Sequence, residues 1–309
     1  MKSRTSLFNL TIFCNFLKRY WLMWVGYCGL LLFSVCLPLL DALQEYARWP
    51  DSYSTAYAGC GRLLGSIETF PLLISLLGCG VIAAISFSYL YNSRHVGMMN
   101  SLPIRRETLF CSVILADMAG LLLADLAVVL VCLAMEAAFG VVNFYALGVS
   151  LLVLVLENVL FLGFAVFCCM LTGNIFAGPA VYLIFNFTAV AVEFMGTYLL
   201  SNLQFGNGGA MAVGHAYWLS PPVWLVSRLQ CAVVDGPVEA YQLTGLGGLS
   251  AYALAGVVFG VLALLLYRKR RMETAGDMVS IEFLKPVFKV CASLAGAMLC
   301  AGLWGCADS

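Results

Sequence analysis

Charged side chains are scarce in this sequence. Asp, Glu, Lys and Arg make up 10% of the residues, whereas hydrophobic residues make up 62%. Soluble domains carry about 25% charged residues and about 45 to 50% apolar residues. This composition excludes an ordinary soluble domain and predicts an integral membrane protein. We expect no nucleic-acid partner.

Motifs for nucleotide hydrolysis and metal binding are also absent. The sequence has no G-x-x-x-x-G-K-[ST] phosphate-binding loop, and the glycines between residues 206 and 214 lack the lysine that such a loop needs. Its two histidines, His95 and His215, fall in different loops, and there is no H-E-x-x-H or Cys-x-x-Cys pair. We therefore expect no cofactor, no metal and no catalytic centre in this chain.

Long apolar runs are what the sequence does contain, and several can cross a bilayer core of about 30 Å as helices. They predict an all-α polytopic membrane protein. Residues 1–20 form an N-terminal interfacial elbow helix, whose amphipathic part is 5–19, although a frayed tail is the alternative. Residues 21–271 form the transmembrane domain, and 272–309 form a cytoplasmic segment with a seventh apolar run at 287–305. The predicted spans are 21–43, 70–91, 108–139, 145–171, 175–200 and 246–267.

The connections between these runs carry further expectations. The third run exceeds the thickness of a bilayer, so its first turns should project beyond the membrane. The polar residues between 44 and 69 predict a loop. The tight turn at 172–174 predicts that the fourth and fifth spans are antiparallel neighbours. The segment 201–245, with its aromatic residues and prolines, is typical of short interfacial helices.

Lys and Arg are distributed unevenly between the two sides that these spans define. If the N-terminus is cytoplasmic, thirteen of the 16 basic residues lie in cytoplasmic segments, and only Arg48, Arg62 and Arg228 lie outside. Basic residues near span ends concentrate on the cytoplasmic side. The sequence therefore predicts a multi-pass membrane protein with its N-terminus inside.

Five acidic residues fall within the spans, where an unpaired carboxylate is costly. Asp117, Asp125 and Glu136 share one face of the third helix, Glu157 lies on the fourth span and Glu193 on the fifth. No Lys or Arg lies at the same depth, so each acid is protonated, faces water or bonds to groups such as Asn158 or Asn186. They predict either interhelical hydrogen bonds or a polar route, and the candidate substrate path is Asp117, Asp125, Glu157 and Glu193.

The polar stretch from Asn92 to Thr108, NSRHVGMMNSLPIRRET, separates the second and third runs. Its arginines either fix orientation and bind anionic lipid, or contact a partner. The phrase Met98-Met99-Asn100-Ser101-Leu102-Pro103-Ile104-Arg105-Arg106-Glu107 resembles the segment between the second and third spans of permease subunits of bacterial ATP-binding cassette (ABC) transporters, type-2 exporter class. Leu171-Thr172-Gly173-Asn174 and Arg271-Met272-Glu273-Thr274-Ala275-Gly276-Asp277 add to the resemblance, which is to a Firmicutes-type branch similar to the permeases of acetoin-utilisation and antibiotic-response operons.

The resemblance implies that residues 93–106 form a coupling helix, which docks on a separate ATP-hydrolysing subunit, and that two permease subunits face each other across the transport path. The implied contacts to the ATPase are Arg94, His95, Met98, Met99, Leu102, Pro103, Arg105 and Arg106. Members of this branch often continue well past the sixth span, so the chain is either part of a longer permease or a short one. A proton-coupled secondary transporter and a non-transporting accessory or sensor protein remain alternatives.

Overall fold

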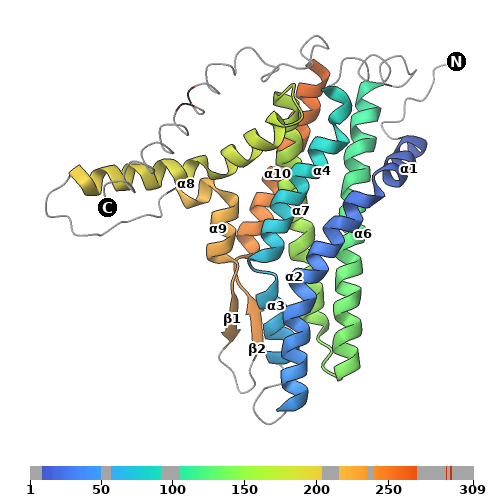
Figure 1. Cartoon of the computed structure of the whole chain (residues 1–309), viewed down its shortest axis with the longest axis vertical. Coiled ribbons are helices and arrows are strands. Elements are labelled where there is room, and N and C mark those ends of the chain that lie inside the picture. Colours follow the sequence, from blue (N-terminus) through green and yellow to red (C-terminus); the bar gives the residue numbers. More distant parts are fainter. Residues whose placement is uncertain are drawn as a thin grey trace.

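The computed structural model of the chain describes residues 9–49, 57–91, 105–203, 216–234 and 240–269, with the single positions 290 and 293. Within these residues the chain is helical apart from one short β-hairpin (Figure 1). The predicted all-α class is therefore confirmed. The seventh apolar run at 287–305 lies almost entirely outside the described residues.

In the described part of the chain, six helices are long and apolar enough to cross a membrane, as the sequence predicts. They are α2 (Trp21–Arg48), α4 (Phe70–Ser86, extended by the helical residues before it), α6 (Arg106–Phe139), α7 (Phe144–Leu171), α8 (Ala177–Leu203) and α10 (Leu246–Lys269). The first helix runs five residues beyond the predicted end at 43. The second is shorter, because α4 ends at Ser86 and a 3-10 turn, η2 (Ser88–Leu90), follows it.

Helix α7 lies at the centre of the bundle and packs against α4, α6, α8 and α10. Its closest approach is to α10, where Gly163 faces the backbone of Gly256 so tightly that a Cβ on either glycine would overlap the other helix. Lipid tails are as apolar as the side chains, so close van der Waals contact is what joins helices in a membrane. The two glycines therefore allow the tightest helix pairing in the bundle.

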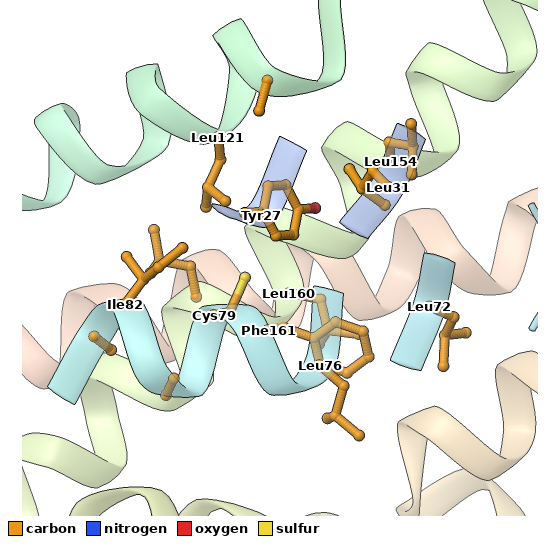
Figure 2. Close-up of a cluster of buried hydrophobic side chains, with 14 of the residues drawn as sticks. Tyr27, Leu31, Leu72, Leu76, Cys79, Ile82, Leu121, Leu154, Leu160 and Phe161 are labelled. Atoms are coloured by element: carbon orange, nitrogen blue, oxygen red, sulfur yellow. The ribbon is translucent and has the colours of Figure 1, made fainter. Parts of the chain in front are cut away.

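The interior of the bundle is apolar at most levels. Figure 2 shows side chains such as Leu76, Leu121, Leu154 and Phe161 surrounding Tyr27, and each of these leucines and Phe161 is 1% exposed or less. Tyr27 is also buried, although it carries a hydroxyl group. A buried hydroxyl needs a hydrogen-bond partner, so polar residues must lie near it.

The N-terminal helix α1 (Leu10–Arg19) packs against α6, and Figure 1 shows it inclined to the bundle. The side chain of Asn9 caps α1, accepting from the Thr11 amide at 3.0 Å, and the Asn9 amide donates to Ser112 Oγ at 3.1 Å. Helix α1 thus begins beside the second turn of α6, and the six residues of α6 before Ser112 rise by about 9 Å. A helix at residues 10–19 is confirmed, whereas its interfacial position and the projection of α6 beyond the membrane stay predictions.

Most of the residues described within 44–69, namely 44–49 and 57–69, are helical, so the prediction of a polar loop is wrong for them. A π-helical turn, η1 (Tyr57–Gly61), leads into α3 (Arg62–Ser66). Charged residues suggested a loop, but Leu63, Leu64 and Ile67 are fully buried and anchor the segment against α2 and α7. The Arg62 Nε–H donates to the Pro38 carbonyl oxygen at 3.3 Å.

Between α8 and α10, the expected short helices are present as η3 (Tyr217–Leu219) and α9 (Pro221–Arg228). An antiparallel hairpin, β1 (Cys231–Val234) with β2 (Ala240–Leu243), was not predicted. It lies at the end of the bundle where α6 stops and α7 starts (Figure 1), which we call the hairpin end. The opposite end, where α4 stops and α6 starts, is the loop end.

Helix α8 departs from the expected arrangement. It packs on α7 near its start, where the rings of Phe164 and Tyr182 lie 5.7 Å apart. Figure 1 shows that α8 then leaves the bundle at a steep angle to α7. The fourth and fifth helices are neighbours at the turn that joins them, as the turn length requires, but they do not run side by side as antiparallel helices.

Candidate functional site

A cluster of polar side chains lies in the middle of the bundle, where α2, α4, α6 and α7 meet. Tyr27 Oη donates to Asn158 Oδ1 at 3.0 Å and lies 3.1 Å from Ser75 Oγ. Asn158 Nδ2 donates to Asp125 Oδ2 at 2.8 Å, and the Cys79 thiol contacts Asn158 Oδ1 at 3.5 Å. Together with Glu157 we call these residues the Asn158 cluster. For Asp125, of the alternatives open from the sequence, the structure shows a hydrogen bond to Asn158.

Glu157 is the least satisfied member of the cluster. Its side chain is fully buried and faces Ser75 and Asp125, yet neither of its carboxyl oxygens accepts a hydrogen bond. Asp125 Oδ1 is likewise buried without a partner. Among the described residues, Lys and Arg occur only in the end turns of the spanning helices or between them. No basic side chain therefore neutralises these acids from within the bundle.

Asp117 lies on the same face of α6, nearer the loop end. Its Oδ1 accepts from the Ser86 hydroxyl of α4 at 2.7 Å, and its Oδ2 has no partner. The thiol of Cys79 faces Asp117, Asp125 and Glu157 alike. The structure thus brings three of the four candidate path residues around one position of α4.

The other two acids lie apart from this cluster. Glu193 on α8 is half-buried and accepts from the Ala216 amide at 2.9 Å, which ties α8 to the segment before η3. Glu136 is buried near the end of α6, and its Oε2 accepts from the Asn143 amide at 3.0 Å, just past the left-handed cap at Gly140 (φ 71°). Both acids therefore stabilise chain reversals.

At the loop end, a second group of side chains joins α4, α6 and α10. Arg268 Nε donates to Glu107 Oε1 at 2.7 Å. Beneath this ion pair, Phe110 stacks on Tyr267 with ring centroids 5.2 Å apart, and Phe87 lies 5.5 Å from Phe110. The hydroxyls of Tyr89 and Tyr267 are 3.4 Å apart. We call these six residues the α6–α10 clasp.

The predicted coupling residues sit next to this clasp. Arg105 and Arg106 are exposed at the start of α6, so they are free to contact a partner or lipid. The remaining predicted contacts lie outside the described residues, namely Arg94, His95, Met98, Met99, Leu102 and Pro103. The chain segment that holds them joins two helix ends that the clasp fixes to α10.

The hairpin end offers no reactive group among its described side chains. The Cys231 amide donates to Glu68, and the Cys60 thiol contacts the Tyr241 carbonyl oxygen at 3.6 Å. Burial, with the nearby Glu68 and Cys60, raises the pKa of Cys231 to about 11. Its thiol is therefore protonated at neutral pH and is a weak nucleophile.

Comparisons with family models, curated proteins and solved structures find no match to this chain. Within the described ranges, no three His, Cys, Asp or Glu side chains are placed so that they could hold a metal ion. Assignment of function therefore depends on the Asn158 cluster, the clasp and the sequence itself.

Several residues near the buried acids were not singled out from the sequence, namely Tyr27, Ser75 and Cys79 of the cluster and Ser86 beside Asp117. A pattern was present, because Ser75, Cys79 and Ser86 are spaced by four and seven residues and so share one face of α4. Ser and Cys are ordinary residues in apolar helices, and the stripe becomes informative only once α4 is seen to face the acids of α6 and α7.

Proposed function

We propose that this chain is the membrane-spanning permease subunit of an ABC transporter of the type-2 exporter class. It moves a substrate across the bacterial cytoplasmic membrane while a separate subunit hydrolyses ATP. Its partners are that ATPase, a second permease subunit and membrane lipid. Six apolar helices and the resemblance of residues 98–107 to the permease coupling segment support the proposal.

The observation that carries the proposal is the construction of the loop end. Residues 92–104 join α4 to α6, and the clasp attaches both of these helix ends to α10 through the aromatic rings of Phe87, Phe110 and Tyr267. A force on the connecting segment therefore reaches three helices at once. Transmission of nucleotide-driven motion needs a contact of this kind, which links a partner to an element with more than one state.

The test is purification of the tagged full-length chain, in mild detergent, from cells that express its neighbouring genes. We expect a P-loop ATPase to co-elute. Arg105→Ala should reduce the amount of ATPase recovered, because truncating one partner of a buried charged contact costs about 2 to 5 kcal/mol, whereas a lipid-facing charge contributes about 1 kcal/mol. Arg62→Ala, at the hairpin end, is the matched control. If the variant with both Arg105→Ala and Arg106→Ala recovers as much ATPase as the unchanged protein, these arginines serve only as orientation signals.

Orientation is tested with single cysteines in a variant that lacks the thirteen native ones. Lys269→Cys lies at the loop end and Gln230→Cys at the hairpin end, and both positions are exposed. If the loop end is cytoplasmic, a membrane-impermeant maleimide added to intact cells labels position 230 and not position 269. Labelling of 269 alone would reverse the proposed topology.

A proton-coupled secondary transporter is the second candidate, and the unpartnered carboxyl oxygens of Asp125 and Glu157 favour it. The amides in Asp125→Asn and Glu157→Gln keep the volume of a protonated acid and most of its hydrogen bonds. If these acids carry protons during transport, both variants lose transport at normal protein levels, and an uncoupler abolishes transport at constant ATP. Transport that survives the uncoupler and both substitutions would favour the ABC permease and a structural role for the acids.

A further inference from the structure

The hydroxyl groups of the Asn158 cluster define the direction of its hydrogen bonds. Each hydroxyl has one hydrogen to donate. Tyr27 uses its hydrogen on Asn158 Oδ1, so in the 3.1 Å contact between Tyr27 and Ser75 it is Ser75 that donates. The hydrogen of Ser75 is then used as well. The Glu157 carboxyl faces Ser75, but neither of its oxygens has a hydrogen-bond partner.

At the other end of this series of hydrogen bonds, Asp125 is an acceptor. Asn158 receives the Tyr27 hydrogen on its oxygen, so its nitrogen is the atom that points at Asp125, and this nitrogen can only donate. Asp125 Oδ2 accepts that bond at 2.8 Å. The series of donors therefore runs from Ser75 through Tyr27 and Asn158 to Asp125, and Glu157 lies outside it.

The surroundings supply no positive charge to this series. Both carboxyl groups are fully buried, and two ionised carboxylates that share a dry site repel each other and lose their hydration. Only Asp125 receives a hydrogen bond in compensation. The titratable groups around them on α2, α4 and α6 carry no positive charge: they are Tyr27, Cys28, Cys79 and Asp117.

We propose that Glu157 and Asp125 form a binding site for a single proton, which is held on Glu157, the carboxyl group that receives no hydrogen bond, while Asp125 stays ionised. Asn158 cannot pass a proton along, because its amide would have to become an imidic acid. The site therefore stores a proton and does not relay it. Loss of the proton would turn the Ser75 hydrogen toward Glu157 and break the contact with Tyr27, which would loosen α2 from α4. The proposal holds whether or not the chain is a permease.

Infrared spectroscopy of the purified full-length protein at neutral pH tests this inference. A protonated carboxylic acid has a C=O stretch that carboxylates and amides lack, and the band shifts when H₂O is exchanged for D₂O. We expect Glu157→Gln to remove one such band and Asp125→Asn to leave it in place. Glu45→Gln, at an exposed position of α2, is the matched control and should change nothing.

Ser75→Ala is the second variant, and it keeps the test decisive if Glu157→Gln does not fold. It removes the hydroxyl group that Glu157 faces, so the band should persist and change in frequency. A spectrum unchanged in Glu157→Gln, or a band lost in Asp125→Asn alone, would overturn the assignment of the proton. The assignment would also be overturned if no carboxylic acid band appeared and sodium chloride, but not choline chloride, stabilised the protein. That result would show that a metal ion occupies the site in place of the proton.

Discussion

The Asn158 cluster and the α6–α10 clasp both join several helices through polar groups, but they do so in opposite ways. In the cluster, carboxyl groups lie in the middle of the bundle with amide, hydroxyl and thiol neighbours and no cation. In the clasp, Glu107 and Arg268 pair at the loop end, with side chains 29% and 52% exposed, over a layer of aromatic rings. The comparison shows that depth, more than residue type, decides how a carboxylate is accommodated.

This difference predicts where the stability of each region resides. An exposed ion pair gains little, because water screens it and both side chains lose freedom. Buried polar groups gain little in net terms, yet they cost much when a partner is removed. We therefore expect the aromatic layer of the clasp to contribute most, the hydrogen bonds of the cluster to contribute less, and the ion pair to contribute least.

The largest expected effect is that of Phe110→Ala. The Phe110 ring is 2% exposed and packs on both Phe87 and Tyr267, so its removal leaves a cavity among three helices. Truncations of this kind lower the free energy of unfolding by about 3 to 5 kcal/mol. The measurement is unfolding of the purified protein in detergent by heat or by SDS. Phe144→Ala, at a ring that is 77% exposed, is the control and should change stability much less.

Asn158→Ala should have an intermediate effect. The substitution removes the partner of both Tyr27 and Asp125 and leaves two buried polar groups unsatisfied. We expect a loss of about 1 to 3 kcal/mol in the same unfolding measurement, since interhelical hydrogen bonds in membranes are individually modest. Gln230→Ala is the exposed control. A loss as large as that of Phe110→Ala would mean that the cluster, and not the aromatic layer, holds the bundle together.

The same comparison shows what could be predicted from the sequence. Long apolar runs predicted the six helices, because nothing but a bilayer accommodates them. The rarity of polar residues in these runs also pointed to Asn158 and Asn186 as possible partners of the buried acids. Tyr27 and Ser75 were missed because a serine hydroxyl in an apolar helix often bonds to its own backbone, and only the packing of α2 on α4 brings these two residues together.

The hairpin and the path of α8 could not be predicted for a different reason. Strands of four residues, Cys231–Val234 and Ala240–Leu243, are too short for alternation to be distinguished from an irregular segment. The direction of α8 depends on contacts far along the chain. The Ser220 hydroxyl donates to the Asn186 carbonyl oxygen and the Ala216 amide donates to Glu193, and both contacts join α8 to residues more than 20 positions away.

The smallest expected effect belongs to the ion pair of the clasp, and it is the sharpest test of the comparison. Glu107→Arg and Arg268→Glu each place two like charges together, whereas the double variant restores an ion pair with its charges exchanged. A double-mutant cycle should give an interaction energy of about 0.2 to 1 kcal/mol. Because the Debye length falls to about 3 Å at 1 M salt, this energy should nearly vanish there.

Coupling in the proposed transporter gives the ion pair a second readout. If the clasp transmits motion from residues 92–104 to α10, each single charge reversal lowers transport-coupled ATP hydrolysis more than its small cost in stability explains, and the double variant recovers it. Recovery of stability without recovery of coupling would show that the ion pair only holds the helix ends together. An interaction energy well above 1 kcal/mol that resists salt would show instead that the pair is shielded from water, and the contrast with the Asn158 cluster would then be lost.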